Sequence, residues 1–438
     1  MRSGALATGS LAVEGCPLWA HHHGVRPARA GGNGDPMRWA STLSRQPRAA
    51  AAFDEAASAL EQQLEGTPPD ILLVFVSPDH ADGYEQIAAQ AARRFARALL
   101  VGCTAGGVIG GAREAEEGPG LSLTAGVLPG AALSAFRVDS DSRLHPVAGA
   151  PDRTDRAGGP AKGGPKLLLL ADPFTLDVPG FIQEIDGAYP GAPKFGGLAS
   201  GGQGPMENRL FIGDEVRRSG GVGVVFSGDV TVDTLIAQGC RPIGSPMLVT
   251  RCQQSLLQEL DGRPAMVALT ELYHALGARD RELMQQSVFL GLELRSDEVE
   301  YEPSELLVRN VLGADERTGA LAVGAELRPM TVAQFMLRDA HSAEEDLRRM
   351  LVRHRRVSTD RPAGALLFSC VGRGAGLFGC PDHDTSLFEE QLGPAPLGGF
   401  FCNGEIGPVG GTTFLHGYTS AFAIFREAHG VAESRESG

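Results

Sequence analysis

The sequence predicts an α/β protein made of repeated strand–helix–strand–strand units with glycine corners, arranged as two pseudo-related domains. Three observations support this fold class. Apolar runs of strand length open each unit, a helical stretch follows each run, and a second strand ends in a glycine-rich corner. The units recur in the same order along the chain, which is typical of an internal repeat.

The three copies share one order of elements: an opening strand, a helix, a second strand with its glycine corner, and a closing strand. In the first copy these elements are predicted at 71–78, 83–98, 98–107 and 121–128. In the second copy they are predicted at 166–173, 178–188, 194–202 and 221–228. In the third copy they are predicted at 364–370, 384–392, 397–405 and 419–425. A weaker fourth copy is predicted at 287–327, where the glycine pair is missing.

The spacing inside the copies supports a true repeat. The opening strand and the corner are separated by 31 residues from Ile71 to Gly102, 30 from Leu167 to Gly197 and 34 from Ala365 to Gly399. The opening runs are apolar without alternation, which indicates strands that are covered on both faces. We expect the glycine corners to converge and to leave space for a ligand between them.

The flanking and linking segments complete the predicted organisation. We expect a disordered extension at 1–36, an N-terminal helix region at 37–69 with its amphipathic stretch at 47–65, and a tail at 429–438. The extension could instead be a transit peptide or a metal-binding histidine run, or Met37 could be the true start. A flexible connection is predicted at 139–165. Further helices are predicted at 255–260, 265–276, 331–335 and 343–353, the last capped by Ser342.

Composition excludes several classes of protein. The 438 residues carry a formal net charge of −14, which disfavours binding to nucleic acid or to an anionic membrane surface. No segment approaches the roughly 20 apolar residues that span a bilayer, and the N-terminus lacks a secretory h-region. The seven cysteines are scattered without a C-x-x-C pair, which favours reduced thiols and a cytoplasmic location.

Several separated motifs resemble the FIST family (F-box and intracellular signal transduction proteins). FVSPDH at 75–80 and VGCTAGG at 101–107 are similar to its N-terminal domain, and QGCRPIG at 238–244 to the junction that follows. VRNVLGAD at 308–315, HSAEEDL at 341–347 and the run from Cys402 to Thr419 are similar to its C-terminal domain. The resemblance implies a FIST N-terminal domain at 70–244 and a FIST C-terminal domain at 245–428.

The resemblance also implies a function. FIST proteins are intracellular input modules thought to sense small ligands, with amino acids proposed, and one branch binds haem and senses nitric oxide. Relatives carry F-box, kinase or chemotaxis modules, so a signalling partner of this chain would act in trans. Two positions depart from the family pattern: Thr104 stands alone where members often have Ser-Thr, and Gly417 follows His416 where members often have Asn.

Candidate ligand-binding residues gather at the corners. They are Cys103, Thr104, Gly106, Gly197, Ser200, Arg373, Cys402, Asn403, Glu405, His416 and Thr419. Arg373 could pair with a ligand carboxylate or be a solvent-exposed loop residue. Glu405 could capture an amino group, act as an acid or base, or stabilise a turn. Cys103 could be a nucleophile or a buried side chain, and His416 a haem ligand or a hydrogen-bonded histidine.

No cofactor and no other metal site are predicted, and the corners lack the phosphate-loop, dinucleotide, G-x-S-x-G and H-E-x-x-H patterns. Either Asp382 or Asp384 is expected to cap the helix that follows. The sequence therefore predicts an intracellular sensory module that binds a small ligand, such as an amino acid or a related carboxylate. A haem-binding nitric-oxide sensor and a hydrolase that uses Cys103 or Glu405 are the alternatives.

Overall fold

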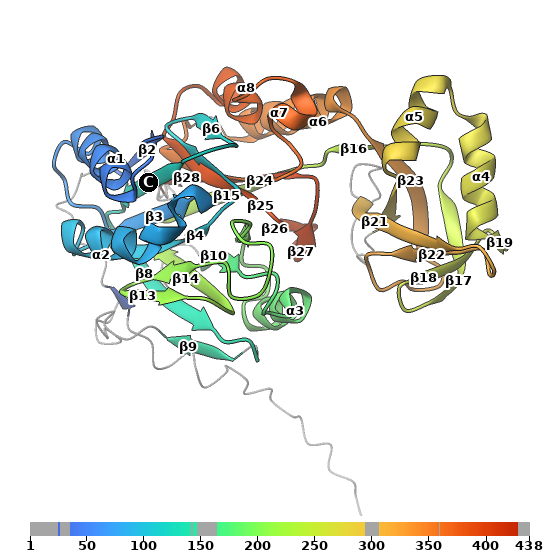
Figure 1. Cartoon of the computed structure of the whole chain (residues 1–438), viewed down its shortest axis with the longest axis horizontal. Helices are drawn as coiled ribbons and strands as arrows, with labels where there is room; N and C mark the ends of the chain where they lie inside the picture. The colour runs from blue at the N-terminus through green and yellow to red at the C-terminus, as the bar shows by residue number, and fades with distance from the viewer. Residues whose placement is uncertain are drawn as a thin grey trace, which may run out of the picture.

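The computed structural model describes residues 25–26, 36–141, 143–146, 164–293, 306–358 and 360–427. The predictions for 1–24, 27–35, the linker part 147–163 and the tail 429–438 lie outside these ranges. Figure 1 shows a larger body on the left, built from three sheets, and a smaller unit on the right. The predicted α/β fold with repeated units is confirmed.

Each repeat copy forms the middle of one sheet in the larger body. The strands of the first copy are Arg38–Ser44 (β2), Ile71–Val76 (β3), Leu99–Thr104 (β4) and Leu121–Val127 (β7). Those of the second are Ala131–Val138 (β8), Lys166–Ala171 (β10), Lys194–Leu198 (β11) and Gly221–Gly228 (β14). Those of the third are Val230–Ala237 (β15), Gly364–Cys370 (β24), Leu397–Cys402 (β25) and Ser420–Glu427 (β28).

The three copies pair their strands in the same way. The opening strand runs parallel to the second strand and antiparallel to the closing strand, as β3 does with β4 and β7. The closing strand in turn pairs antiparallel with the strand that precedes the copy. That first strand, including β2, was not predicted from the sequence. The short strands Val25–Arg26 (β1) and Leu144–Pro146 (β9) extend the second sheet at β8.

A hairpin follows each glycine corner and joins the sheet of another copy. The hairpins are Gly107–Gly110 with Arg113–Ala115 (β5 and β6), Leu210–Ile212 with Glu215–Arg217 (β12 and β13), and Glu405–Val409 with Thr412–His416 (β26 and β27). β5 pairs with β25 of the third copy, β12 with β4 of the first, and β26 with β11 of the second. The exchange is cyclic, so each second strand has a partner from a different copy.

The opening strands bury both faces, which explains their continuous apolar sequence. In β3, Leu73 and Phe75 enter a central core shared by the three sheets, whereas Leu72 and Val74 face the helices outside. Phe400 of β25 stacks on Phe75 with ring centroids 4.7 Å apart. Because the period of a strand is two, every second residue of each opening strand serves each face.

Helices cover the outer face of each sheet (Figure 1). They are Ala49–Gln63 (α1), the 3-10 turn Pro78–Gly83 (η2) and Tyr84–Arg94 (α2) on the first sheet, Val178–Ala188 (α3) on the second, and Ala340–Val357 (α6), Ala375–Phe378 (α7) and His383–Leu392 (α8) on the third. The expected helices at 47–65 and 343–353 are thus present. Asp339, not Ser342, caps α6, since its carboxylate accepts the Ser342 N–H. Within the described ranges, no helix combines the length and apolar character that crossing a membrane requires.

The glycine corners contain one glycine that the packing requires. A Cβ on Gly102, Gly196 or Gly399 would lie 1.9, 1.8 or 1.9 Å from a carbonyl oxygen of the neighbouring opening strand. The three positions face Val74, Leu169 and Leu367 in the strand register. The equivalent glycine of the second copy is therefore Gly196, one residue before the predicted Gly197.

The smaller unit is an antiparallel sheet inserted between β15 and α6. Its strands are Cys240–Pro242 (β16), Met247–Gln253 (β17), Leu256–Leu260 (β18), Arg263–Pro264 (β19), Phe289–Glu293 (β20), Leu306–Asp315 (β21), Ala320–Val323 (β22) and Val332–Arg338 (β23). Pairing of β20 with β23 curls the sheet into a partial barrel. The helices Ala265–Ala275 (α4) and Ala278–Gln286 (α5) pack with it.

The insertion corrects two predicted helices and the predicted fourth copy. Residues 255–260 and 331–335 were predicted to be helical but lie mainly in β18 and β23. The expected fourth copy at 287–327 contributes β20, β21 and β22, which pair antiparallel without a helical crossover. The predicted stretches 70–244 and 245–428 both contribute strands to the larger body, because the third copy returns to it after the insertion.

Candidate functional site

Buried polar side chains gather at one end of the third copy. The parallel strands β24 and β25 end there, β28 begins there, and α8 starts beside them. In α/β sheets, ligands commonly bind beyond the carboxyl ends of parallel strands. The group comprises Ser369, Arg373, Asp384, Cys402, Glu405, Thr419 and Ser420, and we call it the third-copy network.

Arg373 and Asp384 form a buried ion pair in this network. Nε of Arg373 lies 2.8 Å from Oδ2 of Asp384, and Nη2 lies 3.0 Å from Oδ1. This is the bidentate geometry of a guanidinium paired with a carboxylate. Ser369 and Ser420 donate to the same carboxylate. Burial alone would raise the pKa of Asp384, but Arg373 and the hydrogen bonds hold that pKa well below its usual range.

One nitrogen of Arg373 is left without a partner. Its side chain is fully buried, yet Nη1 makes no hydrogen bond in the described part of the chain. A Cβ built on Gly239 would come within 3.3 Å of this nitrogen. A buried N–H without an acceptor is costly. Nη1 of this guanidinium is therefore available for an acceptor that the described residues do not supply.

Glu405 is the second charged group of the network. Its Oε2 accepts hydrogen bonds from the Thr419 N–H at 3.1 Å and the Thr419 hydroxyl at 2.7 Å, and its Oε1 lies 3.4 Å from Sγ of Cys402. Burial raises the pKa of Glu405 to about 7, although these hydrogen bonds and the charge of Arg373 oppose the rise. A carboxyl in this state can exist in both protonation forms near neutral pH.

The thiols near the network are protonated. Burial raises the pKa of Cys370 to about 11 and of Cys240 to about 12, and it raises the pKa of Cys402 well above its usual value. Since the thiolate is the nucleophilic form, these cysteines act as small, weakly polar side chains. The same holds for Cys103, which lies fully buried in the central core and whose pKa burial also raises.

The inserted unit and the first copy both contact this region. Arg338, the last residue of β23, donates to the Gly372 carbonyl and lies over the Tyr418 ring at 4.9 Å. From the β5–β6 hairpin, Glu114 accepts the Thr385 N–H at 3.0 Å, and burial raises the pKa of its carboxyl to about 8. Three separate parts of the chain therefore surround the network.

Sequence reasoning missed the partners of Arg373. Asp384 was expected as a helix cap, but it pairs with Arg373. Asp382 occupies the cap position without a capping bond, and its carboxylate accepts instead from Arg113 at 2.8 Å and the Glu114 N–H at 2.6 Å. An aspartate in a first helical turn looks the same in sequence whether it caps or pairs, so no local signal distinguishes the two roles.

The predicted residues at the other glycine corners are in contact with other groups of the protein itself. Ser200 accepts the Gly106 N–H at 2.8 Å and donates to the Phe401 carbonyl, so the corners of the three copies converge on this hydroxyl. Thr104 hydrogen-bonds to Asn208 at 3.0 Å. A Cβ on Gly197 would lie 3.0 Å from Sγ of Cys402. The convergence is as expected, but the protein's own hydrogen bonds fill it.

Among the described residues, neither Asn403 nor His416 hydrogen-bonds to the network through its side chain, although His416 lies opposite Glu405 in the strand register. The Asn403 side chain is exposed. Nε2 of His416 lies 3.0 Å from the Gly407 carbonyl oxygen, and burial lowers the pKa of this imidazole to about 4. His416 lines neither of the two cavities described next. A fully enclosed ring with an engaged Nε2 does not fit an axial haem ligand, so we derive no haem chemistry for it.

Two cavities flank helix α6. The first, of about 540 Å³, lies between α6, β15 and the turn of the β26–β27 hairpin. The second, of about 1080 Å³, lies between α6, β16 and the barrel residues Leu306 and Met336. Cys240 lines the second cavity and also lies close enough to Arg373 to feel its charge. The second cavity therefore lies close to the third-copy network.

Comparison with known proteins identifies similar chains. Residues 70–263 match the family model described as FIST N domain, and residues 268–408 match the one described as FIST C domain. An uncharacterized protein of Mycobacterium tuberculosis (strain ATCC 25618 / H37Rv) is 34% identical over 389 residues, covering 89% of this chain and 100% of that protein. One of Mycobacterium bovis (strain ATCC BAA-935 / AF2122/97) is 34% identical over 389 residues, covering 89% and 99%. An F-box/LRR-repeat protein of Arabidopsis thaliana is 33% identical over 137 residues, covering 28% and 26%.

Proposed function

The chain belongs to the FIST family, whose domains are sensory domains of signal transduction, and we propose that it binds a free amino acid or a related small carboxylate at the third-copy network. The observation that carries this proposal is the unpartnered Nη1 of the buried Arg373, which lies near Glu405. A small molecule with a hydrogen-bond acceptor for Arg373 and a hydrogen-bond donor for Glu405 would supply a partner to both side chains.

The chemistry of the two groups matches an α-amino acid. A carboxylate accepts hydrogen bonds from guanidinium nitrogens, and such charge-assisted bonds are among the strong ones in proteins. A carboxylate such as Glu405, in turn, attracts an ammonium group. Burial raises the pKa of Glu405 to about 7. A ligand cation beside Glu405 would favour the ionised carboxylate, and that carboxylate in turn attracts the cation.

Access to the network involves the inserted unit. Both charged side chains are buried, so a ligand requires a movement that opens a path from the second cavity past Cys240. Arg338 and Tyr418 join the barrel side to the loops of the network, and they are the contacts that such a movement changes. A ligand that prefers the opened or the reclosed arrangement shifts their populations, which is how binding becomes a signal.

The remaining parts of the proposal concern partner and compartment. We propose a signalling protein that acts in trans as the receiver of the conformational change. We also propose a cytoplasmic location, which is supported by the six free cysteines of the described residues. Free thiols persist where the compartment is reducing. The observations do not favour a hydrolase that uses Cys103 as nucleophile, because burial raises the pKa of its thiol.

Titration calorimetry with the free amino acids and with acetate, propionate and succinate tests the proposal. We expect one ligand class to bind saturably and to raise the melting temperature. At a hundredfold excess over Kd, the free energy of unfolding should rise by about 2.7 kcal/mol. Arg373→Lys keeps a cation beside Asp384 but removes Nη1, and Glu405→Gln removes the carboxylate. Each should weaken binding by about tenfold or more, which is about 1.4 kcal/mol.

The matched control is Arg217→Lys in β13 at the edge of the first sheet, where Arg217 pairs with Asp139 outside the network. This variant should bind like the wild type. Circular dichroism must first show that all three variants are folded. No saturable binding by any of these compounds, or equal weakening in Arg217→Lys, would contradict the proposal.

A further inference from the structure

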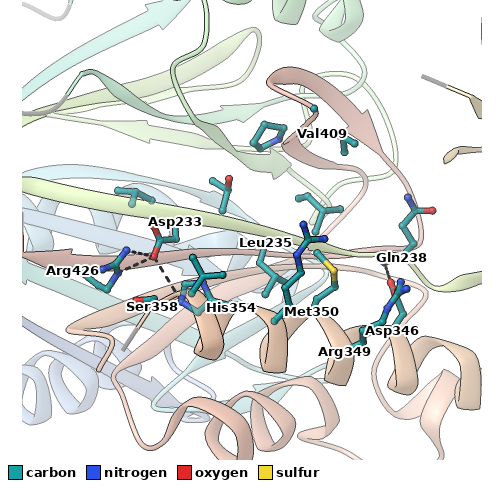
Figure 2. A pocket seen from close by; sticks show the side chains of 17 residues that line it. Asp233, Leu235, Gln238, Asp346, Arg349, Met350, His354, Ser358, Val409 and Arg426 are labelled. Carbon is teal, nitrogen blue, oxygen red and sulfur yellow. Dashed lines mark hydrogen bonds and ion pairs between the residues drawn. The ribbon is translucent and has the colours of Figure 1, made fainter. Parts of the chain in front are cut away.

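The first cavity is built from four segments that are distant in sequence. β15 supplies Leu235 and its neighbours, and α6 supplies side chains between Asp346 and Val357. The end of β26 and the hairpin turn supply Pro408, Val409 and Gly410, and β28 supplies Arg426. Figure 2 shows the α6 side chains below the cavity and Val409 above it. Its volume of about 540 Å³ falls in the range of small-molecule sites.

The cavity has an apolar middle and a polar group at each end. Leu235 and Met350 lie at the centre of Figure 2. At one end, Arg426 binds Asp233 with nitrogen–oxygen distances of 2.8 and 2.5 Å, and His354 lies 3.8 Å from the same carboxylate. Burial lowers the pKa of His354, so this imidazole is mainly neutral at pH 7.

The other end repeats this arrangement with different partners. Asp346 accepts the Gln238 N–H at 2.6 Å and pairs with Arg349 at 2.5 Å. The two carboxylates that line the cavity, Asp233 and Asp346, are therefore both neutralised by arginines of the protein. A ligand cation would have to displace one of these arginines, whereas a ligand anion would not.

Arg353 provides charge that nothing in the described chain neutralises. It lines the cavity, stands one helical turn after Arg349 on α6, and is exposed. Among the described residues it has neither a hydrogen bond nor an ion pair. The charged lining holds three arginines and two carboxylates, and Asp360 outside the lining also pairs with Arg426 at 3.7 Å. The positive charge that remains unpaired at the cavity is therefore that of Arg353, in a protein whose formal net charge is −14. An unpaired positive charge of this kind selects for an anion.

We propose that the first cavity is a second ligand site, which binds a small organic anion with an apolar body. The carboxylate or phosphate head group pairs with Arg353, and the body lies along Leu235, Met350 and Val409. Burial of the body supplies affinity in proportion to the apolar area covered. The site is separate from the third-copy network, since none of the network residues lines this cavity.

Titration calorimetry with sodium octanoate, octyl phosphate and octanol tests this site. The wild-type chain should bind octanoate or octyl phosphate saturably with one site per chain, and it should bind octanol at least tenfold more weakly. The tighter of the two anions identifies the preferred head group. Arg353→Gln should weaken binding of that anion by about tenfold, since the paired charge is lost. Val409→Asp, on the hairpin turn, should also weaken it because it places a carboxylate at the cavity.

Arg353 lines both cavities, whereas Val409 lines only the first, so weaker binding in Val409→Asp assigns the anion to the first cavity. Two control variants test whether the loss of binding is specific to this site. Arg355→Gln removes a cation from the same helix that lines neither cavity, and its binding should equal that of the wild type. Arg373→Lys should bind the anion normally, so that failure of the amino-acid site does not affect this result. Absence of saturable binding, equal loss in Arg353→Gln and Arg355→Gln, or octanol binding as tightly as octanoate overturns the proposal.

Discussion

The second and third copies of the repeat end their opening strands in contrasting ways. After β10, Asp172 accepts the Asn208 amide at 2.8 Å and the Thr175 hydroxyl, and Asn208 accepts the Gly202 N–H. In the described chain, no side-chain atom of these three residues is buried without a partner. After β24, Arg373 keeps one nitrogen unpartnered and Glu405 has a raised pKa.

This difference shows how one scaffold carries both structure and function. Strand pairing and the required glycine are the same in the two copies. The second copy uses its strand end to hold the fold together, and the side chains of Asp172, Thr175 and Asn208 are matched there. The third copy leaves charge unmatched at the equivalent end, which costs stability and is typical of a site that another molecule completes.

The largest effect is expected when the Arg373 cation of the third copy is removed. Arg373→Met leaves the Asp384 carboxylate buried without its partner, and breaking a buried pair costs about 3–5 kcal/mol. Urea denaturation should show this loss in the free energy of unfolding. Arg217→Met removes a more exposed pair at the edge of the first sheet and should cost about 1 kcal/mol or less. Similar losses in the two variants would mean that the third-copy pair has no special burial cost.

A smaller effect concerns the pH dependence of stability. The pKa of Glu405 rises from 4.5 to about 7 on folding. The folded state therefore holds the proton more tightly, and the contribution of this group is full below pH 4.5 and is lost as pH rises through 7. At about 1.4 kcal/mol per pKa unit, the change is roughly 3 kcal/mol over that interval.

Glu405→Gln removes this contribution. We expect the free energy of unfolding of the wild type to fall relative to that of the variant between pH 5 and pH 8, as measured by urea denaturation at each pH. Taking the difference between the two proteins cancels the titration of Glu114 and His416, which both retain. Parallel pH profiles would show that Glu405 titrates alike in the folded and unfolded chains.

The smallest expected effect concerns Ser200, whose hydroxyl joins the glycine corners of the three copies. Ser200→Ala leaves the Gly106 N–H and the Phe401 carbonyl without their partner, which costs about 1–3 kcal/mol. Ser227→Ala removes one longer bond of a half-buried hydroxyl on β14 and should cost less. Binding at the third-copy network should be unchanged in Ser200→Ala, as measured by calorimetry. Loss of binding would place Ser200 in the ligand site after all.

Much of the larger body was predictable because its signals are local. Each opening strand is a continuous apolar run, and a run of this kind is what burial on both faces requires, as Leu72 and Leu73 show on opposite sides of β3. The strands of the barrel were harder to predict. Residues 255–260 and 331–335 are short and mix polar with apolar side chains, so tertiary pairing decided their conformation rather than propensity.

The site was predictable in part. Arg373, Cys402, Glu405 and Thr419 were named from the sequence, and the structure brings them together. Asp384 was missed because a first-turn aspartate is normally a cap. The cavity residues of α6 were missed because Arg349 and Arg353 look like an ordinary solvated helix face. Their meaning depends on β15 and on the hairpin turn, which are more than 50 residues away from them in the chain.

The exchanged hairpins also affect how the chain folds during synthesis. Gly196 in β11 pairs with Ile406 in β26, 210 residues further along. During synthesis, β11 leaves the ribosome long before its neighbour exists, so its edge stays open while the whole inserted barrel is translated. The barrel contains its own core and can fold during this interval. The last sixth of the protein then closes two sheets at once, which makes the nascent chain most vulnerable to aggregation just before it is complete.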